Sequence, residues 1–222
     1  MMSRPDWSST SPEQRGRVAL RGVDPHATEG RVDLYWLPLG AGGRCVRANG
    51  RMYEEVVARL AGREPLALYH SALEVQHAGE RFVIEMAPVW SCRDPQRGVV
   101  GEGSVGLSGL GRFELFRYEV RCWRDGHIPD VDEAIESPQH LSHDGVLARR
   151  VLDLLPAFPR RTWGADEQHT GDMWNSNSLV SWLLARSGHD LTTVTPPVGG
   201  RAPGWSAGLV VAARETHAVT ST

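Results

Sequence analysis

The stretch TGDMWNSNSLVSWLLARSG, residues 170–188, changes from small polar residues to an apolar segment near its middle. The spacing of the apolar residues predicts a helix that begins at the NSNS run and ends at Gly188, since glycine commonly follows the last turn of a helix. Asparagine and serine are preferred where helices begin, so capping alone is one explanation of the run. The expected buried face of this helix comprises Leu179, Val180, Trp182, Leu183 and Leu184.

Ser176, inside the NSNS run, has a second interpretation as a nucleophile. The first turn of a helix carries unpaired backbone N–H groups and the positive end of the helix dipole, which together stabilise negative charge. That position favours an attacking oxygen and supplies donors for an oxyanion. The flanking Asn175 and Asn177 can donate to the same oxyanion or cap the helix, and the run itself leaves both alternatives open.

The composition predicts a soluble globular protein. The chain has 222 residues, 23% of them charged, and a formal net charge of −3 from 24 basic and 27 acidic residues. No basic stripe or acidic tail stands out, so a nucleic-acid partner is not expected. The first residues lack the apolar stretch of a signal peptide, and the apolar runs are too short for a membrane span. These features predict a cytoplasmic protein.

The cysteines and histidines do not predict a metal site. The three cysteines are Cys45, Cys92 and Cys122. Their odd number and spacing favour neither a disulfide framework nor structural zinc. Cys92 and Cys122 do not begin a helix, so neither is favoured as a nucleophile. His140, His143 and His169 fall in loops or near a helix start without the pairing typical of ligands, and no cofactor is expected.

The apolar pattern predicts one α+β domain at residues 31–212, between a flexible N-terminal arm at 1–30 and a flexible C-terminal tail at 213–222. Strands are expected at 31–40, 66–75, 81–90, 112–126 and 209–214, and helices at 51–62, 145–155 and 175–188. The second and third of these strands form a hairpin about a turn at 76–80. The Gly-rich residues 92–111 are expected to be a long surface loop. The whole is an antiparallel sheet with a few helices, concentrated late in the chain.

His70 lies inside the apolar strand LYHSALEV, where an imidazole is unusual unless it has a role. A histidine satisfied within the core is the ordinary explanation, and a general base for Ser176 is the functional one. Glu85, in the partner strand of the hairpin, is preferred as the residue that orients the ring. Glu74 shares a sheet face with His70 by the two-residue period of a strand, and either glutamate can instead pair with an arginine across strands.

Three elements taken together resemble the PPPDE family. These are permuted papain-fold proteins that include DeSI-type deSUMOylating isopeptidases, and they are related to the NlpC/P60 and lecithin–retinol acyltransferase groups. The strand VDLYWLPLG, the His-bearing strand of a hairpin and an N-x-N-[ST] turn that opens a late helix follow in the family's order. His70 matches the family's histidine, and Ser176 stands where the family has its catalytic cysteine. The resemblance covers roughly residues 31–90 and 165–190.

The resemblance implies a papain-like fold with Ser176 as nucleophile, His70 as base and Glu85 as a third residue. Trp174, two residues before Ser176, and Tyr69, next to His70, are then expected to contact substrate. The substrate would be a small molecule, peptide or protein, with an amide, isopeptide or ester bond to be hydrolysed or transferred.

Serine in the cysteine position changes the expected chemistry. A thiol can exist as a thiolate beside an imidazolium, whereas a hydroxyl must give its proton to the base during attack. One alternative is therefore a slower Ser/His hydrolase or acyl transferase. The others are a catalytically inactive papain-like module that holds a peptide or acyl ligand, a serine substituted for a native cysteine, and an α+β protein whose capping residues only mimic the motif.

Overall fold

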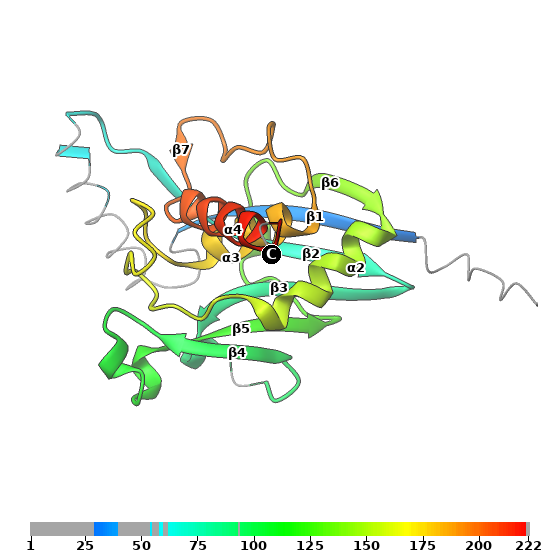
Figure 1. Cartoon of the computed structure of the whole chain (residues 1–222), viewed down its shortest axis with the longest axis horizontal. Coiled ribbons are helices and arrows are strands. Elements are labelled where there is room, and N and C mark those ends of the chain that lie inside the picture. Colours follow the sequence, from blue (N-terminus) through cyan, green and yellow to red (C-terminus); the bar gives the residue numbers. More distant parts are fainter. Residues whose placement is uncertain (1–28, 40–53, 55–57, 60–61, 93, 221–222) are drawn as a thin grey trace, which may run out of the picture.

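The computed structural model describes residues 29–39, 54, 58–59, 62–92 and 94–220 (Figure 1). Within these ranges the chain has an α+β fold, in which a seven-stranded, mostly antiparallel sheet packs against three α-helices. The N-terminal arm expected from the sequence lies outside the described residues except for Glu29 and Gly30, which begin the first strand. Of the helix expected at 51–62, the described residues Glu54, Ala58 and Arg59 are helical.

The strands of the sheet lie in the order β4-β5-β3-β2-β1-β6, and β7 pairs with β2. Only the β2–β7 pair is parallel among the strand pairs of the described residues. The strands are β1 (Glu29–Pro38), β2 (Ala67–His77), β3 (Glu80–Pro88), β4 (Val99–Ser104), β5 (Arg117–Arg124), β6 (Gln139–Asp144) and β7 (Gly200–Arg201).

The predicted hairpin is confirmed as β2 and β3. Its loop consists of Ala78 and Gly79, both with positive φ, which is the backbone that a two-residue loop needs to match the twist of the strands. The expected strand at 112–126 is also present, as β5, which pairs with β3 along its whole length.

Three strands were not predicted: β4, β6 and the two-residue β7. The expected loop at 92–111 contains β4, which pairs with β5 at one edge of the sheet. Glycine usually weakens a strand. Here Gly103 packs directly against the ring of Tyr118, and a Cβ atom at this position would clash with the ring. β6, at the other edge, pairs with β1 and has mostly polar residues.

The last element is a helix rather than a strand and a tail. Residues 209–214 were expected to form a strand, and residues 213–222 a flexible tail, but α4 (Trp205–Thr220) includes both up to Thr220. The apolar run in this segment is short, and a short run does not distinguish a buried strand from a buried helix.

The three helices pack on the same face of the sheet. They are α2 (Gly145–Leu154), α3 (Ser176–Ser187) and α4, and the first two confirm the helices expected at 145–155 and 175–188. In Figure 1 they lie together in front of the strands. Leu34, Leu73 and Ile84 on the strands join residues of all three helices in the main hydrophobic core.

The opposite face of the sheet carries a second, smaller cluster. Leu37, Ala72 and Val83 project there and pack against Ile128. Ile128 belongs to residues 125–136, which we call the strap because this segment crosses the second face after β5. The strap is fixed at one end by a hydrogen bond from Arg81 Nη2 to the carbonyl of Gly126 and at the other by one from Ile135 N to the carbonyl of Trp36.

Candidate functional site

The first turn of α3 occupies a break in the pairing along one edge of β2. On that edge β3 pairs with β2 from His77 only as far as Leu73, and β7 pairs with Ala67 and Leu68. The other edge of β2 is taken by β1 throughout, ending with the hydrogen bond from Leu39 N to the carbonyl of Leu68. The carbonyl of Tyr69, between β3 and β7, is therefore left for a partner outside the sheet.

Asn177 provides that partner. Its Nδ2 donates to the carbonyl of Tyr69 at 2.9 Å and to the carbonyl of Pro203 at 2.8 Å. Its Oδ1 accepts from the hydroxyl of Ser71 at 2.8 Å. The side-chain amide of Asn177 thus joins α3, β2 and the segment that leads into α4, and all of its hydrogen atoms are used.

Asn175 and Ser178 form a capping box at the start of α3. Asn175 Oδ1 accepts from the backbone N–H groups of Asn177 and Ser178, and Ser178 Oγ accepts from Asn175 N. Asn175 Nδ2 also donates to the carbonyl of Pro203, and Ser178 Oγ to that of Gly204. Capping, one of the two explanations of the NSNS run, is therefore confirmed for these two residues.

Ser176 is the member of the run whose side chain makes no hydrogen bond to a described residue. It is 3% exposed, and no hydrogen bond joins its hydroxyl to another residue in the described ranges. The oxyanion donors expected beside it are largely committed, because the N–H groups of Asn177 and Ser178 already point to Asn175 Oδ1. The site therefore offers a hydroxyl at a helix start but few free donors around it.

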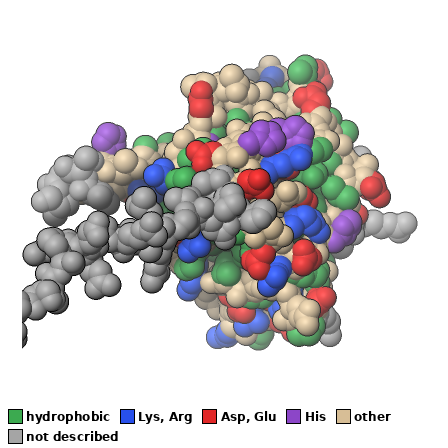
Figure 2. Space-filling model, turned by 90° about the vertical axis from the view of Figure 1, so that its right-hand side faces the viewer, with side chains coloured by type: hydrophobic (Ala, Val, Ile, Leu, Met, Phe, Trp, Pro, Cys, Tyr) green, Lys and Arg blue, Asp and Glu red, His purple; other side chains and the backbone are tan. Residues whose placement is uncertain are grey.

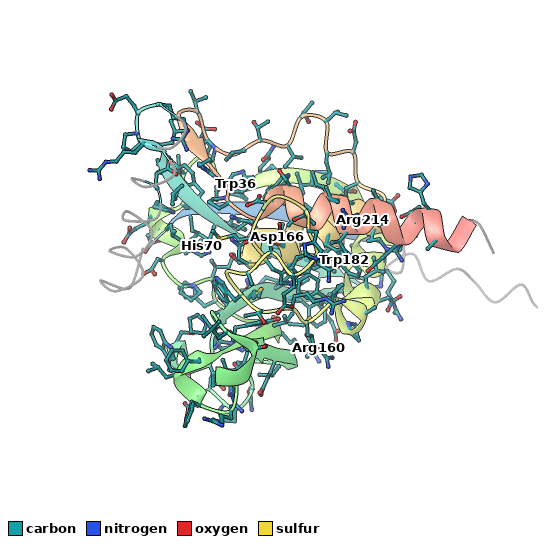
Figure 3. The ribbon with its side chains drawn as sticks, turned by 60° about the vertical axis from the view of Figure 1, so that its left-hand side comes forward. Trp36, His70, Arg160, Asp166, Trp182 and Arg214 are labelled. Carbon is teal, nitrogen blue, oxygen red and sulfur yellow. The ribbon has the colours of Figure 1, made fainter. Side chains whose placement is uncertain are left out.

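His70 projects from β2 away from α3. Tyr69 and Ser71 face the helices, as the core contacts of Tyr69 and the bond from Ser71 to Asn177 show. Successive residues of a strand point to opposite faces, so the His70 ring lies on the second face, beside Asp130 of the strap. In Figure 3 the labelled His70 lies well to the left of Trp182, which belongs to α3.

The environment of His70 makes its ring a weak base. Burial lowers the pKa of His70 to about 4, and the carboxylate of Asp130 opposes the shift only in part. The ring is therefore neutral at pH 7, and it forms no hydrogen bond with Ser176 in the described structure. A general base works best when its pKa lies near the working pH, so this ring is poorly matched to that role.

Glu85 shares the second face with His70 but is bound elsewhere. Arg121 Nη1 donates to Glu85 Oε1 at 2.9 Å, and Arg121 Nε to Glu119 Oε2 at 2.9 Å. Burial raises the pKa of Glu85, while Arg121 favours its charged form. Glu74 is bound to Arg81 at 2.8 Å. Both glutamates are thus cross-strand partners of arginine, which was the alternative to a role in orienting His70.

Trp174 and Tyr69, expected to contact substrate, are part of the packed core. The ring of Trp174 stacks on Phe158 with 5.1 Å between centroids. The ring of Tyr69 lies so close to Gly200 that a Cβ atom there would clash with it. Neither side chain is available to a ligand in this conformation.

The remaining titratable groups do not assemble a metal centre in the described ranges. No group of three or more His, Cys, Asp or Glu side chains there could hold a metal ion. His140 is instead 2.6 Å from the buried carboxylate of Asp33 through its Nδ1. Burial raises the pKa of the Cys122 thiol to about 11, which makes it a poor nucleophile, and Cys45 lies outside the described residues.

The surface and the helices agree with the composition. The face in Figure 2 mixes acidic, basic and apolar side chains, and no continuous basic stripe crosses the described residues drawn there. Among the described helices, none combines the length and the apolar character needed to cross a bilayer.

Comparison with known proteins returned no match: no family model, no curated protein and no solved structure matches the chain.

Proposed function

We propose that this chain is a papain-like module, of the permuted type found in the PPPDE family, that lacks catalysis and acts by binding a peptide or acyl ligand. One observation carries the proposal: the side chains around Ser176 that catalysis would use are committed to structure. Asn175 and Asn177 hold α3 to β2 and to the segment before α4. The NSNS run is thereby explained without a reaction.

The electrostatics support the same proposal. Acyl transfer by serine needs a base that takes the hydroxyl proton and donors that stabilise the oxyanion. His70 lies on the second face of the sheet, and burial holds its pKa at about 4. The two N–H groups best placed for an oxyanion already donate to Asn175.

A Ser176/His70 hydrolase or acyl transferase is the second candidate, and one observation favours it. The Ser176 hydroxyl forms no hydrogen bond to a described residue. Ser176 is also the first residue of the twelve-residue helix α3, which begins beside the break in the pairing of β2 with β3. For this candidate the His70 ring, which lies on the second face of the sheet, would have to reach the opposite face, where α3 lies.

A fluorophosphonate probe separates the two candidates. The inactive module predicts that Ser176 is not labelled, so that the protein and the variant Ser176→Ala give the same background signal. Labelling that disappears in Ser176→Ala would overturn the proposal in favour of the hydrolase. The variant Ser176→Cys extends the test, because thiol-dependent hydrolysis of a thioester substrate would show that the catalytic geometry is still reachable.

Binding is tested separately by intrinsic fluorescence. Trp36 and Trp205 lie 5.1 Å apart, centroid to centroid, near the start of α3, so their emission reports on this region. A saturable change in emission on titration with an acylated peptide would support the proposal. No change in emission with either the acylated or the unacylated peptide would count against it.

From the composition we also propose that the protein is cytoplasmic and has no nucleic-acid partner.

A further inference from the structure

The connection between β4 and β5 is a compact excursion that carries apolar side chains on its outside. Residues 105–116, which we call the β4–β5 excursion, are closed at their base by a hydrogen bond of 2.8 Å from Val105 N to the carbonyl of Phe116. Figure 1 shows this segment projecting from the end of the sheet, at the lower left. The short helical turns η4 (Ser108–Leu110) and η5 (Glu114–Phe116) shape it.

Its apolar residues are exposed to an unusual degree for a folded protein. Leu107 and Leu115 are each 66% exposed, and Phe113 is 50% exposed. Trp90, which is 45% exposed, lies in η3 (Val89–Ser91), and η3 contacts η5. Exposed apolar side chains on contacting segments, here η3 and η5, are typical of an interaction surface, and aromatic residues are enriched at the centre of such surfaces.

The charges on the excursion indicate which partner fits. Arg112 and Glu114 flank Phe113, both are exposed, and neither forms an ion pair within the described part of the chain. Arg112 lies over the Phe113 ring, 4.9 Å from its centroid. At the base of the excursion, in contrast, Arg117 is already paired with Glu102 at 3.5 Å.

A surface on which a cation and an anion, neither of them ion-paired with a described residue, lie next to an apolar residue is complementary to itself. In a two-fold dimer both copies present the same surface. A contact between two different residues across the interface therefore occurs twice, once in each direction. We propose that the β4–β5 excursion is a homodimer interface, in which Arg112 of each copy pairs with Glu114 of its partner around the apolar residues. This inference does not depend on the proposed function.

Sedimentation velocity over a range of protein concentrations tests the interface. The wild-type chain should change from monomer to dimer as its concentration rises. Leu115→Asp should raise the dimer Kd by at least about tenfold, since it puts charge in the apolar centre. Val198→Asp is the matched control, because Val198 is 95% exposed and lies outside the excursion. A wild type that stays monomeric, or a dimer that Leu115→Asp leaves unchanged, would overturn the proposal.

Exchange of the two charges tests the pairing itself. Arg112→Glu and Glu114→Arg should each weaken the dimer, because like charges then face each other across the two-fold axis. The double variant should return the Kd to within about threefold of the wild-type value, because the pairs are restored with their signs reversed. A double variant as weak as the sum of both single variants would rule out this pairing. Circular dichroism of every variant confirms that the exposed changes leave the fold intact.

Discussion

The side chain of Asn177 takes the place of a neighbouring strand beside Tyr69, with 2.9 Å between Asn177 Nδ2 and the Tyr69 carbonyl oxygen. The same amide group also binds Pro203 and Ser71. One buried side chain therefore completes the edge of β2 and fixes the segment before α4. Because buried polar atoms that lose their partner are costly, this relationship governs the stability of the whole region.

Replacing Asn177 should destabilise the fold far more than replacing Ser176. Asn177→Leu leaves the buried carbonyl of Tyr69 without its donor and the buried hydroxyl of Ser71 without its acceptor, and should lower the free energy of unfolding by about 3 kcal/mol or more. Ser176→Ala removes a hydroxyl without a partner in the described structure and should change it by about 0.5 kcal/mol or less. Urea denaturation of both variants gives the comparison. Equal losses would mean that the Ser176 hydroxyl has a structural partner after all.

Local patterns in the sequence predicted the elements that form the site. The NSNS run followed by Leu179 and Val180 predicted α3, and the run around His70 predicted β2, because capping and apolar periodicity are properties of neighbouring residues. The capping box was readable from the same run, in the spacing of Asn175 and Ser178.

The relation between His70 and Ser176 could not be read in the same way. Which face of the sheet His70 occupies depends on its pairing with Leu37, more than thirty residues away, and on the docking of α3 at Tyr69. The edge strands β4 and β6 were missed for a similar reason, since their polar and glycine residues form strands only because β5 and β1 offer a partner.

The buried guanidinium of Arg121 should be essential to the second face of the sheet. It is fully buried between Glu85 and Glu119, and it also donates to the carbonyl of Pro88. Arg121→Met leaves the buried carboxylate of Glu85 without its arginine, whereas Glu119 keeps Arg97 at 2.6 Å, and should lower the free energy of unfolding by about 3–5 kcal/mol. Thermal or urea denaturation measures the loss.

An exposed ion pair provides the control for Arg121. Arg149 and Asp153 lie 2.8 Å apart on the outer side of α2, and Arg149→Met should destabilise the fold far less than Arg121→Met, because water screens an exposed ion pair. If the two variants lose similar amounts, the Arg121 network contributes no more than a surface pair. Adding Glu85→Leu to Arg121→Met should recover part of the loss, because it removes the buried carboxylate that has lost its arginine.

Stability should fall on acidification because of His70. Its pKa is about 4 in the folded chain against an ordinary value of 6.5, so the unfolded chain binds the proton more readily. The free energy of unfolding should therefore decrease as the pH falls from about 6.5 to about 4, by at most about 3 kcal/mol, and the His70 contribution should then level off.

His70→Gln isolates this contribution. Burial also lowers the pKa of His189, so the wild type has more than one source of the acid dependence. The difference between wild type and His70→Gln, measured by urea denaturation at several pH values, should shrink toward pH 4. A constant difference across that range would mean that the folded and unfolded chains protonate His70 alike.

Gly208 should be the position where α3 and α4 tolerate no side chain. A Cβ atom there would clash with Ser181 Oγ and with the carbonyl oxygen of Ser178, both on α3. Alanine normally stabilises a helix relative to glycine by about 1 kcal/mol, so a loss would reveal the close approach of the two helices. We expect Gly208→Ala to lower the free energy of unfolding by about 1–3 kcal/mol.

Gly109→Ala is the control, because a Cβ atom at Gly109 would meet no atom within 4 Å. The free energy of unfolding of this variant should stay close to that of the wild type. If both alanines are tolerated equally, α4 can move away from α3, and the hydrogen bonds that Ser178 and Ser181 make to the start of α4 would not hold the two helices together.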